Sequence, residues 1–295
     1  MTTNNIQPHP LVSVVIPVHN RGGQVHKTLD SVYNQSYRPL ELIIVNDGST
    51  DETLYEINLW LSDKCGDSTF STLLLTQRQQ GAPAARNHGV ERAHGEFIQF
   101  LDSDDQLTPQ KVSEQMNRLI ETKKNVAICD FAYVDEDDKV IASVENTGNL
   151  WQKVATRGSL FIATPLIHFS FFHKGLRWEP NLKRNQDIDF NLKLMLLTDA
   201  YEYTPGSYCR YVQHKGARIS DLYSQTAPEY WKRIKTLYAF HVQSKVYIPT
   251  VNQTYYTRSL RFLFVGLIAY AIKLPIKRHL PGIVMHVRSR RNRGK

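Results

Sequence analysis

Apolar runs alternate with helical patterns over the first hundred residues of this chain. Four runs have the length and the apolar content of buried strands: 11–18, 40–46, 72–76 and 97–101. Three intervening segments have the composition and spacing of helices: 24–35, 52–62 and 83–94. This alternation predicts β-α-β units and an α/β fold, in which a Rossmann-like, mostly parallel sheet is flanked by helices.

The pattern changes at about residue 126. Short strands are expected over 126–134 and 139–143, followed by a loop-rich aromatic stretch from Trp151 to Trp178. Helical periodicity resumes over 187–198, which predicts a helix that packs against the sheet. No Pro/Gly-rich linker separates the two halves.

Polar residues follow three of the predicted strands. They form the clusters 17–20, 46–51 and 102–105. In open α/β sheets, ligands bind beyond the carboxyl ends of the strands. We therefore expect these three loops to converge on one crevice.

The third cluster places three carboxylates within four positions, in the order Asp102, Ser103, Asp104 and Asp105. Carboxylates this close repel one another unless a cation or several hydrogen-bond donors neutralise them. Mg and Mn suit such a pair, because they bind one or two carboxylates and complete their coordination with phosphate oxygens and water. The alternative is a helix start, in which Ser103 or Asp104 caps a helix that Pro109 helps to begin.

Two common phosphate-binding motifs are absent from the sequence. No two glycines are separated by a single residue, so there is no G-x-G-x-x-G fingerprint, and the only Gly-Lys pair is at the extreme end. A carboxylate-bound metal is then the natural way to hold a diphosphate.

The net charge of +8 is concentrated at one end of the chain. Residues 230–295 contain fourteen Lys and Arg and no carboxylate, and these charges flank the eleven-residue apolar run 262–272. This run is shorter than the roughly 20 residues that a membrane-spanning helix needs. A basic helical tail at an anionic membrane surface is therefore expected rather than nucleic-acid binding. The alternative is a buried core helix followed by a disordered basic end.

Two further features favour a cytoplasmic protein. The three cysteines are far apart in sequence and odd in number, which argues against a disulfide framework or a zinc site. The first residues lack the basic and apolar segments of a secretory signal. Together with the basic tail, these features predict a peripheral protein on the cytoplasmic face of the inner membrane.

Five segments in order resemble family 2 glycosyltransferases, which are inverting enzymes with the GT-A nucleotide-sugar fold. The matching segments are 14–20, 41–51, 81–89, 95–105 and 186–190. The resemblance covers about residues 11–200. It implies a nucleotide-sugar-binding half over 1–110 and an acceptor-binding half of the same domain over 111–229, while the charge pattern sets apart the basic helical tail over 230–295.

The resemblance also implies the residues that bind the donor. They are Pro17, His19, Asn20, Asp47, Arg86, Asp102, Ser103 and Asp104. Asp47 would accept a hydrogen bond from the base, most often uracil, and Arg86 would face the nucleotide or its phosphates. Asp104 would bind Mn or Mg and Asp102 would reach the ribose or the metal's water shell, with His214 as a further ligand. The alternatives are a tight turn over 47–51 that caps the helix from Glu52, which is compatible with the binding role, and a surface ion pair at Arg86.

Inversion requires a base on the acceptor side, because the acceptor hydroxyl loses its proton as the new bond forms. By the resemblance this base is Asp187, although Gln186 stands where an acidic residue is common, as Asn46 does before Asp47. Asp189 is the alternative base. On a helix it points about 200° away from Asp187, so both cannot face the acceptor. The other interpretation of Asp187 is a helix N-cap.

The resemblance and the charge pattern together predict a metal-dependent, single-addition transferase. It would move one sugar from a UDP-sugar to a hydroxyl of a glycan or lipid-linked acceptor in surface polysaccharide or lipopolysaccharide assembly. A catalytically silent binding protein of the same fold is the alternative, because Gln186 and Asn46 replace common acidic residues. A sugar nucleotidyltransferase ranks last, because the loop after the first strand only poorly approximates a glycine-rich triphosphate loop.

Overall fold

The first half of the chain folds as strands and helices in strict alternation. The structure, a computed structural model, describes residues 9–64, 66–148, 160–182, 186–198 and 200–213. The elements of the first half are β1 (Val12–Val18), α1 (Val25–Tyr33), β2 (Leu40–Asp47), α2 (Thr53–Asp63), β3 (Phe70–Gln77), α3 (Ala82–Glu91) and β4 (Phe97–Phe100). The predicted elements are confirmed here, with ends that differ by three residues or fewer.

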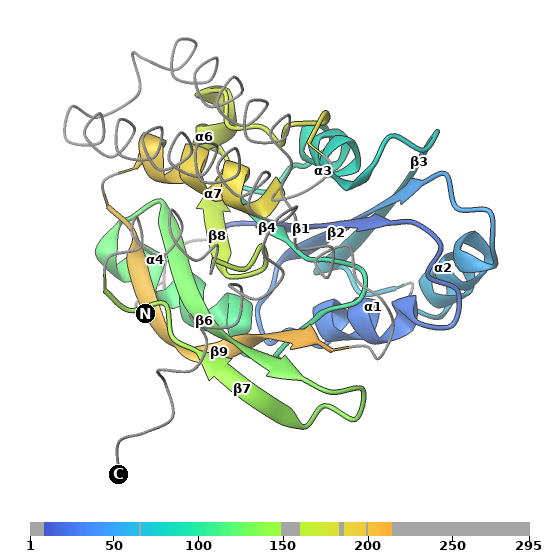
Figure 1. The fold of residues 1–295 in the computed structure, drawn as a ribbon, viewed down its shortest axis with the longest axis horizontal. Helices are drawn as coiled ribbons and strands as arrows, with labels where there is room; N and C mark the ends of the chain where they lie inside the picture. Colours follow the sequence, from blue (N-terminus) through green and yellow to red (C-terminus); the bar gives the residue numbers. More distant parts are fainter. Residues whose placement is uncertain (1–8, 65, 149–159, 183–185, 199, 214–295) are drawn as a thin grey trace, which may run out of the picture.

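The central strands β1 and β2 form because most of their side chains are apolar on both faces. Every residue of β1 and β2 is buried, as expected for parallel strands that are covered from both sides. Figure 1 shows α1 and α2 on one side of these strands and α3 on the other. The helix α1 packs through Val25, Leu29 and Val32, whose spacing forms one apolar stripe.

The second half adds shorter and more varied elements. They are β5 (Gln106–Leu107), α4 (Lys111–Thr122), β6 (Val126–Val134), β7 (Val140–Val144), β8 (Pro165–His168), α6 (Ser170–His173), α7 (Gln186–Leu197) and β9 (Glu202–Val212). The predictions for β6, β7 and α7 are confirmed, whereas β5, β8 and β9 were not predicted. Part of the expected aromatic stretch, residues 151–159, lies outside the described residues.

The described strands form one mixed sheet, which corrects the prediction of a mostly parallel one. The strand order is β3-β2-β1-β4-β8-β6-β9-β5, and β7 pairs with β6 beside this path. The strands β3, β2, β1 and β4 are parallel, but β8 runs antiparallel to both β4 and β6. The β-α-β pattern sets strand direction in the first half only, because the second half has no such regular alternation.

The strand β9 contains a break that hides it in the sequence. Its pairing with β6 steps from Cys129–Thr204 to Asp130–Ser207, so two residues of β9 are left out of register. These residues are Pro205 and Gly206, which are typical of turns. The Gly206 amide instead donates to Asp130 Oδ2 over 3.0 Å, so a buried carboxylate replaces the missing strand partner of this amide.

The same pairing brings two distant cysteines together. Cys129 Sγ and Cys209 Sγ lie 3.6 Å apart as buried free thiols. Burial raises the pKa of the Cys209 thiol and lowers that of the nearby Lys111 ammonium. Lys111 donates to Gln99 Oε1 on β4. These buried polar groups therefore link α4, β4, β6 and β9 inside the core.

The predicted basic tail lies outside the described residues, as do Phe262–Ile272 and His214. Among the residues that the structure does describe, no helix is both long and apolar enough to cross a membrane.

The helix α3 packs closely on the sheet at Gly89. A Cβ at Gly89 would lie 2.4 Å from Val15 Cγ1 and 3.2 Å from Val45 Cγ2. Gly89→Ala is therefore expected to lower the free energy of unfolding by about 1–2 kcal/mol, because overpacking outweighs the helix propensity of Ala. Urea denaturation would measure this. Glu91→Ala at the exposed end of α3 should change stability by less than about 0.5 kcal/mol, and equal values for the two variants would contradict the packing.

Candidate active site

The loops after β1 and β2 are joined by reciprocal hydrogen bonds. The Asn20 amide donates to Ser49 Oγ over 3.1 Å, and Asn20 Oδ1 accepts from the Thr50 amide over 2.9 Å. Asn20 has a φ of 50°, a left-handed conformation that Asn tolerates better than most residues. The exposed Asn20 thus aligns the two loops.

A second link between these loops passes through Thr53. The Arg21 amide donates to Thr53 Oγ1 over 2.6 Å, and the Thr53 hydroxyl donates to Asp51 Oδ1 over 2.5 Å. This hydroxyl contact is the main reason why the pKa of Asp51 is lowered. Asp51 also accepts from the Thr53 amide, so it supports the first turn of α2. The backbone of Arg21 is therefore held in place.

Asp47 organises the segment that follows β3. Its carboxylate is buried and accepts hydrogen bonds from Gln77 Nε2 at 2.7 Å, the Gln80 amide at 2.8 Å and the Gly81 amide at 2.7 Å. The predicted capping turn over 47–51 is present through Asp51, which accepts from the Thr53 amide at the start of α2, whereas the donors to Asp47 itself precede α3. Binding of a nucleotide base to Asp47 remains a prediction beside this structural role.

His19 is held between the same loops. Its Nδ1 lies 2.9 Å from the Asp47 carbonyl, which can only accept, so Nδ1 carries the proton. The Gln79 amide group lies 3.0 Å from Nε2 and can then donate to it. Pro17 is buried inside β1 and pairs in register with Val45. The predicted pocket residues Pro17 and His19 thus mark the end of β1.

Each of the two half-exposed aspartates after β4 has its own arginine. Asp102 Oδ1 lies 2.5 Å from Arg86 Nη2, and Asp104 Oδ2 lies 2.8 Å from Arg21 Nη2. Arg21 Nε also donates to Ser103 Oγ over 3.3 Å. The predicted Arg86 is therefore in this cluster, whereas Arg21 was not predicted. A basic residue directly after the first strand-end cluster was its only signal in the sequence.

The helix-start interpretation of this cluster is wrong. The strand β5 follows the aspartates, and α4 begins only at Lys111, with Gln110 as its N-cap residue. Asp105 turns away from the cluster. It is buried and accepts from the Val212 amide of β9 over 3.0 Å. Asp105 therefore supports the sheet, which leaves Asp102 and Asp104 for the site.

Arg86 joins the two halves of the domain. Its guanidinium carbon lies 4.4 Å from the centre of the Trp178 ring, and its Nη1 donates to Gln186 Oε1 over 3.4 Å. The next residue, Asn87, makes 2.9 Å hydrogen bonds to both the amide and the carbonyl of Trp178. Trp178 in turn stacks on Phe190 of α7 at 4.0 Å. The surface ion pair considered for Arg86 is excluded, because its guanidinium is buried.

The two candidate bases on α7 differ in environment. Asp189 is buried and pairs with Lys193 over 2.7 Å, one helical turn away. Asp187 is half-buried in the first turn of the same helix. The neighbouring Gln186 reaches Arg86, so it connects this turn to Asp102. Of the two carboxylates, Asp187 is therefore the more exposed.

The donor set fits a metal that is completed by a substrate. Within the described ranges, no group of three or more His, Cys, Asp and Glu side chains could enclose an ion. Mg and Mn commonly bind one or two carboxylates and complete their coordination with phosphate oxygens and water. Asp102 and Asp104 can supply the carboxylates. His214, the predicted further ligand, lies outside the described residues.

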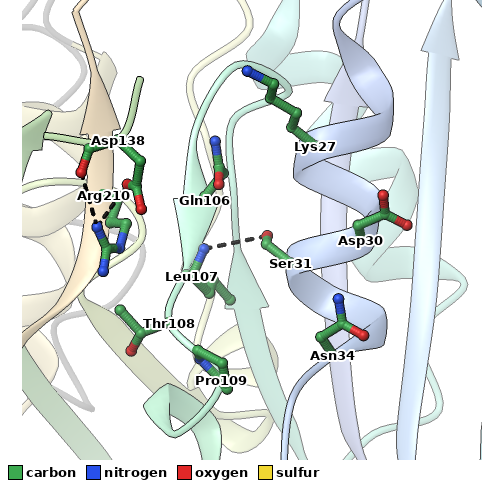
Figure 2. A pocket seen from close by; sticks show the side chains of 10 residues that line it. All are labelled: Lys27, Asp30, Ser31, Asn34, Gln106, Leu107, Thr108, Pro109, Asp138 and Arg210. Atoms are coloured by element: carbon green, nitrogen blue, oxygen red, sulfur yellow. Dashed lines mark hydrogen bonds and ion pairs between the residues drawn. The ribbon is translucent and has the colours of Figure 1, made fainter. Parts of the chain in front are cut away.

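A separate hollow of about 330 Å³ lies between α1, β5 and the β6–β7 turn. Figure 2 shows its lining, where Leu107 N donates to Ser31 Oγ and Arg210 pairs with Asp138. Its other cation, Lys27, donates to the Glu136 carbonyl over 3.4 Å. None of its lining residues belongs to the predicted site.

Comparison with known proteins identifies the family. The model of glycosyl transferase family 2 matches residues 13–181, more than half of the chain, so the protein belongs to this family. A glycosyltransferase of unknown specificity from Haemophilus influenzae is 35% identical over 62% of this chain and 71% of its own length. The glycosyltransferase YibD of Escherichia coli is 32% identical over 72% of this chain and 64% of its own length. The match thus spans under two thirds of this second relative.

Solved structures show the same fold. Staphylococcus aureus TarS, residues 1–349, has been solved with UDP and with UDP-GlcNAc. The UDP-GlcNAc complex superimposes with a TM-score of 0.63 at 19% identity, covering 79% of this chain and 66% of that one. The UDP complex gives a TM-score of 0.60 at 18% identity over 79% and 64%.

The three donors on Asp47 provide a test of this geometry. Asp47→Asn replaces one acceptor oxygen with a donor, which then faces an N–H group. We expect faster hydrogen exchange at the Gln80 and Gly81 amides and a loss of about 1–3 kcal/mol of stability. Exchange measured by mass spectrometry would check it. Asp137→Asn on the exposed β6–β7 turn is the control, and unchanged exchange in residues 77–81 of the Asp47 variant would refute the assigned hydrogen bonds.

Proposed function

We propose that this protein is an inverting transferase that moves one sugar from a UDP-sugar to a hydroxyl of a glycan or lipid-linked acceptor. The observation that carries the proposal is the line of contacts from Asp102 through Arg86 to Gln186, next to Asp187. These contacts connect the proposed diphosphate-binding site at the strand ends with the half-buried carboxylate of Asp187 on α7. The fold that binds UDP and UDP-GlcNAc in TarS supports the choice of donor.

On the donor side, the loops after β1, β2 and β4 would surround the nucleotide. His19 and Asn20 stand at the end of β1, and the segment that Asp47 organises follows β3. One oxygen of a carboxylate can accept a ring N–H in addition to its protein donors, because each oxygen has two lone pairs. We infer that Asp47 reads the base and that Pro17, His19 and Asn20 border the same pocket.

The leaving nucleotide requires positive charge near its phosphates. Asp104 would hold Mn or Mg, and Asp102 would contact the metal directly or through the metal's water shell. The ion would neutralise the charge that develops on a departing diphosphate. Ser103 lies between these two carboxylates and contacts Arg21. Arg21 and Arg86 supply two guanidinium groups of the kind that bind phosphate oxygens in pairs.

On the acceptor side, Asp187 would act as the general base. Its carboxylate takes the proton of the acceptor hydroxyl while the oxygen bonds to the anomeric carbon and the bond to the nucleoside diphosphate breaks. A single displacement of this kind inverts the anomeric configuration. Asp189 is unsuited to this role, because it is buried and its charge is engaged with Lys193.

A catalytically silent binding protein is the second candidate, favoured by Gln186 in place of an acidic residue. In the structure Gln186 accepts from Arg86, a contact that a carboxylate would also make. Gln186 therefore preserves the connection to Asp102. Turnover separates the two candidates, because only the transferase releases UDP from a donor.

Asp187→Asn is the direct test of the base. We expect transfer and slow UDP-sugar hydrolysis to fall by about 10²–10⁴-fold, because the proton acceptor is lost, while UDP affinity stays within about twofold. UDP release measured with a coupled assay, together with calorimetry of UDP binding, would check this. Glu91→Gln, a carboxylate at the exposed end of α3, serves as the control. Full activity in the Asp187 variant would exclude this base, and no activity in any form would favour the silent protein.

A lipid-linked acceptor in surface polysaccharide assembly would place the protein at the cytoplasmic face of the inner membrane. The basic residues of 230–295 supply the expected attraction to anionic headgroups.

Vesicle co-sedimentation tests this attraction. The full chain should sediment with vesicles that contain anionic lipid and should be released as salt rises, because Lys and Arg contacts to headgroups are screened. A chain shortened near Tyr256 should remain in the supernatant while still binding UDP. Equal sedimentation of the two forms would rule out the tail as the attachment.

A further inference from the structure

The two aspartate–arginine pairs after β4 differ in how easily they can open. Arg86 is 5% exposed, with its guanidinium stacked on Trp178 and bonded to Gln186 as well as to Asp102. The Arg21 side chain is 35% exposed, and its partner Asp104 is 28% exposed. Within the described part of the chain, the guanidinium of Arg21 donates hydrogen bonds to Ser103 Oγ and Asp104 Oδ2.

The backbone of Arg21 does not need to move for this pair to open. Its amide is held by Thr53 Oγ1 at 2.6 Å, so the start of the side chain stays beside the loop after β2. Rotation about the side-chain bonds alone can take the guanidinium from Asp104 toward a neighbouring group. Arg86 has less freedom, because its buried guanidinium lies over the Trp178 ring and has two hydrogen-bond partners.

We propose that Arg21 is a resident cation on Asp104, which excludes the metal until a nucleotide diphosphate draws the guanidinium away. This inference rests on the proposed function and assigns the order of events in its donor site. With Arg21 and Arg86 in place, two guanidinium groups offset the charges of Asp102 and Asp104, so a divalent cation gains less by approaching them. A diphosphate offers Arg21 paired oxygens, which guanidinium groups bind well.

The consequence is a coupling between metal and nucleotide. The diphosphate frees Asp104 for the metal, and the metal on Asp104 keeps Arg21 on the diphosphate. Each ligand therefore increases the affinity for the other by the same factor. Asp102 takes no part in this exchange, because Arg86 stays on it.

Mn²⁺ binding without nucleotide is the decisive measurement. Electron paramagnetic resonance of free Mn²⁺ would be recorded with the wild type, Arg21→Gln, Arg21→Lys and the control Lys27→Gln, which removes one charge from the exposed face of α1. Arg21→Gln should bind Mn²⁺ roughly three- to fivefold more tightly than the wild type, a size typical of half-exposed ion pairs. Arg21→Lys and Lys27→Gln should stay close to the wild type.

The same titrations with UDP present measure the coupling. In the wild type UDP should tighten Mn²⁺ binding, and in Arg21→Gln this gain should fall by at least the same three- to fivefold factor. Equal Mn²⁺ affinities for the wild type and Arg21→Gln without UDP would overturn the role of Arg21, even if the wild type binds UDP with Mn²⁺. If the wild type binds no UDP while Arg21→Gln still binds Mn²⁺ more tightly, the role of Arg21 stands and the proposed function fails. If Lys27→Gln bound Mn²⁺ as tightly as Arg21→Gln does, the change in affinity would come from the overall charge of the protein, and this would also overturn the proposal.

Discussion

Two guanidinium–carboxylate pairs at the end of β4 are the interaction on which the site depends. Asp102 and Asp104 stand two positions apart, and without partners their charges would repel and favour protonation. Arg86 comes from α3 and Arg21 from the loop after β1, so neutralising the carboxylates also ties these segments to β4. Removing the buried Arg86 would leave the half-exposed Asp102 without its ion-pair partner, and its charge would then repel that of Asp104 more strongly.

Arg86 extends this constraint to the acceptor side. Its ring contact with Trp178, and the stack of Trp178 on Phe190, set the position of α7 relative to the strand ends. The carboxylate proposed as the base is therefore placed by the same side chain that neutralises Asp102. A single arginine relates the donor site to the acceptor site, and this explains how Gln186 can replace an acidic residue without loss of the connection.

Much of the first half could be predicted from the sequence, because β-α-β units carry strong local patterns. The mainly apolar β1 and β2, and the strand-end clusters that include Asp47 and Asp102, needed no tertiary information. The mixed direction of the sheet was not predicted. The strand β9 was missed because Pro205 and Gly206 are typical of a turn, and only the contact between the Gly206 amide and Asp130 shows that the strand continues through them. Arg21 and Trp178 could not be placed, since their roles come from contacts between segments far apart in the chain. The burial of Asp189 had a signal in its i,i+4 spacing to Lys193.

A crystal structure of the protein with UDP and Mn²⁺ would test the central claim most directly. The account predicts the uracil at the end of β2 near Asp47, the ion on Asp104 between that carboxylate and the diphosphate, and the Arg86–Asp102 pair intact. It would be contradicted by UDP bound away from the ends of β1, β2 and β4, or by an Arg86 that has left Asp102.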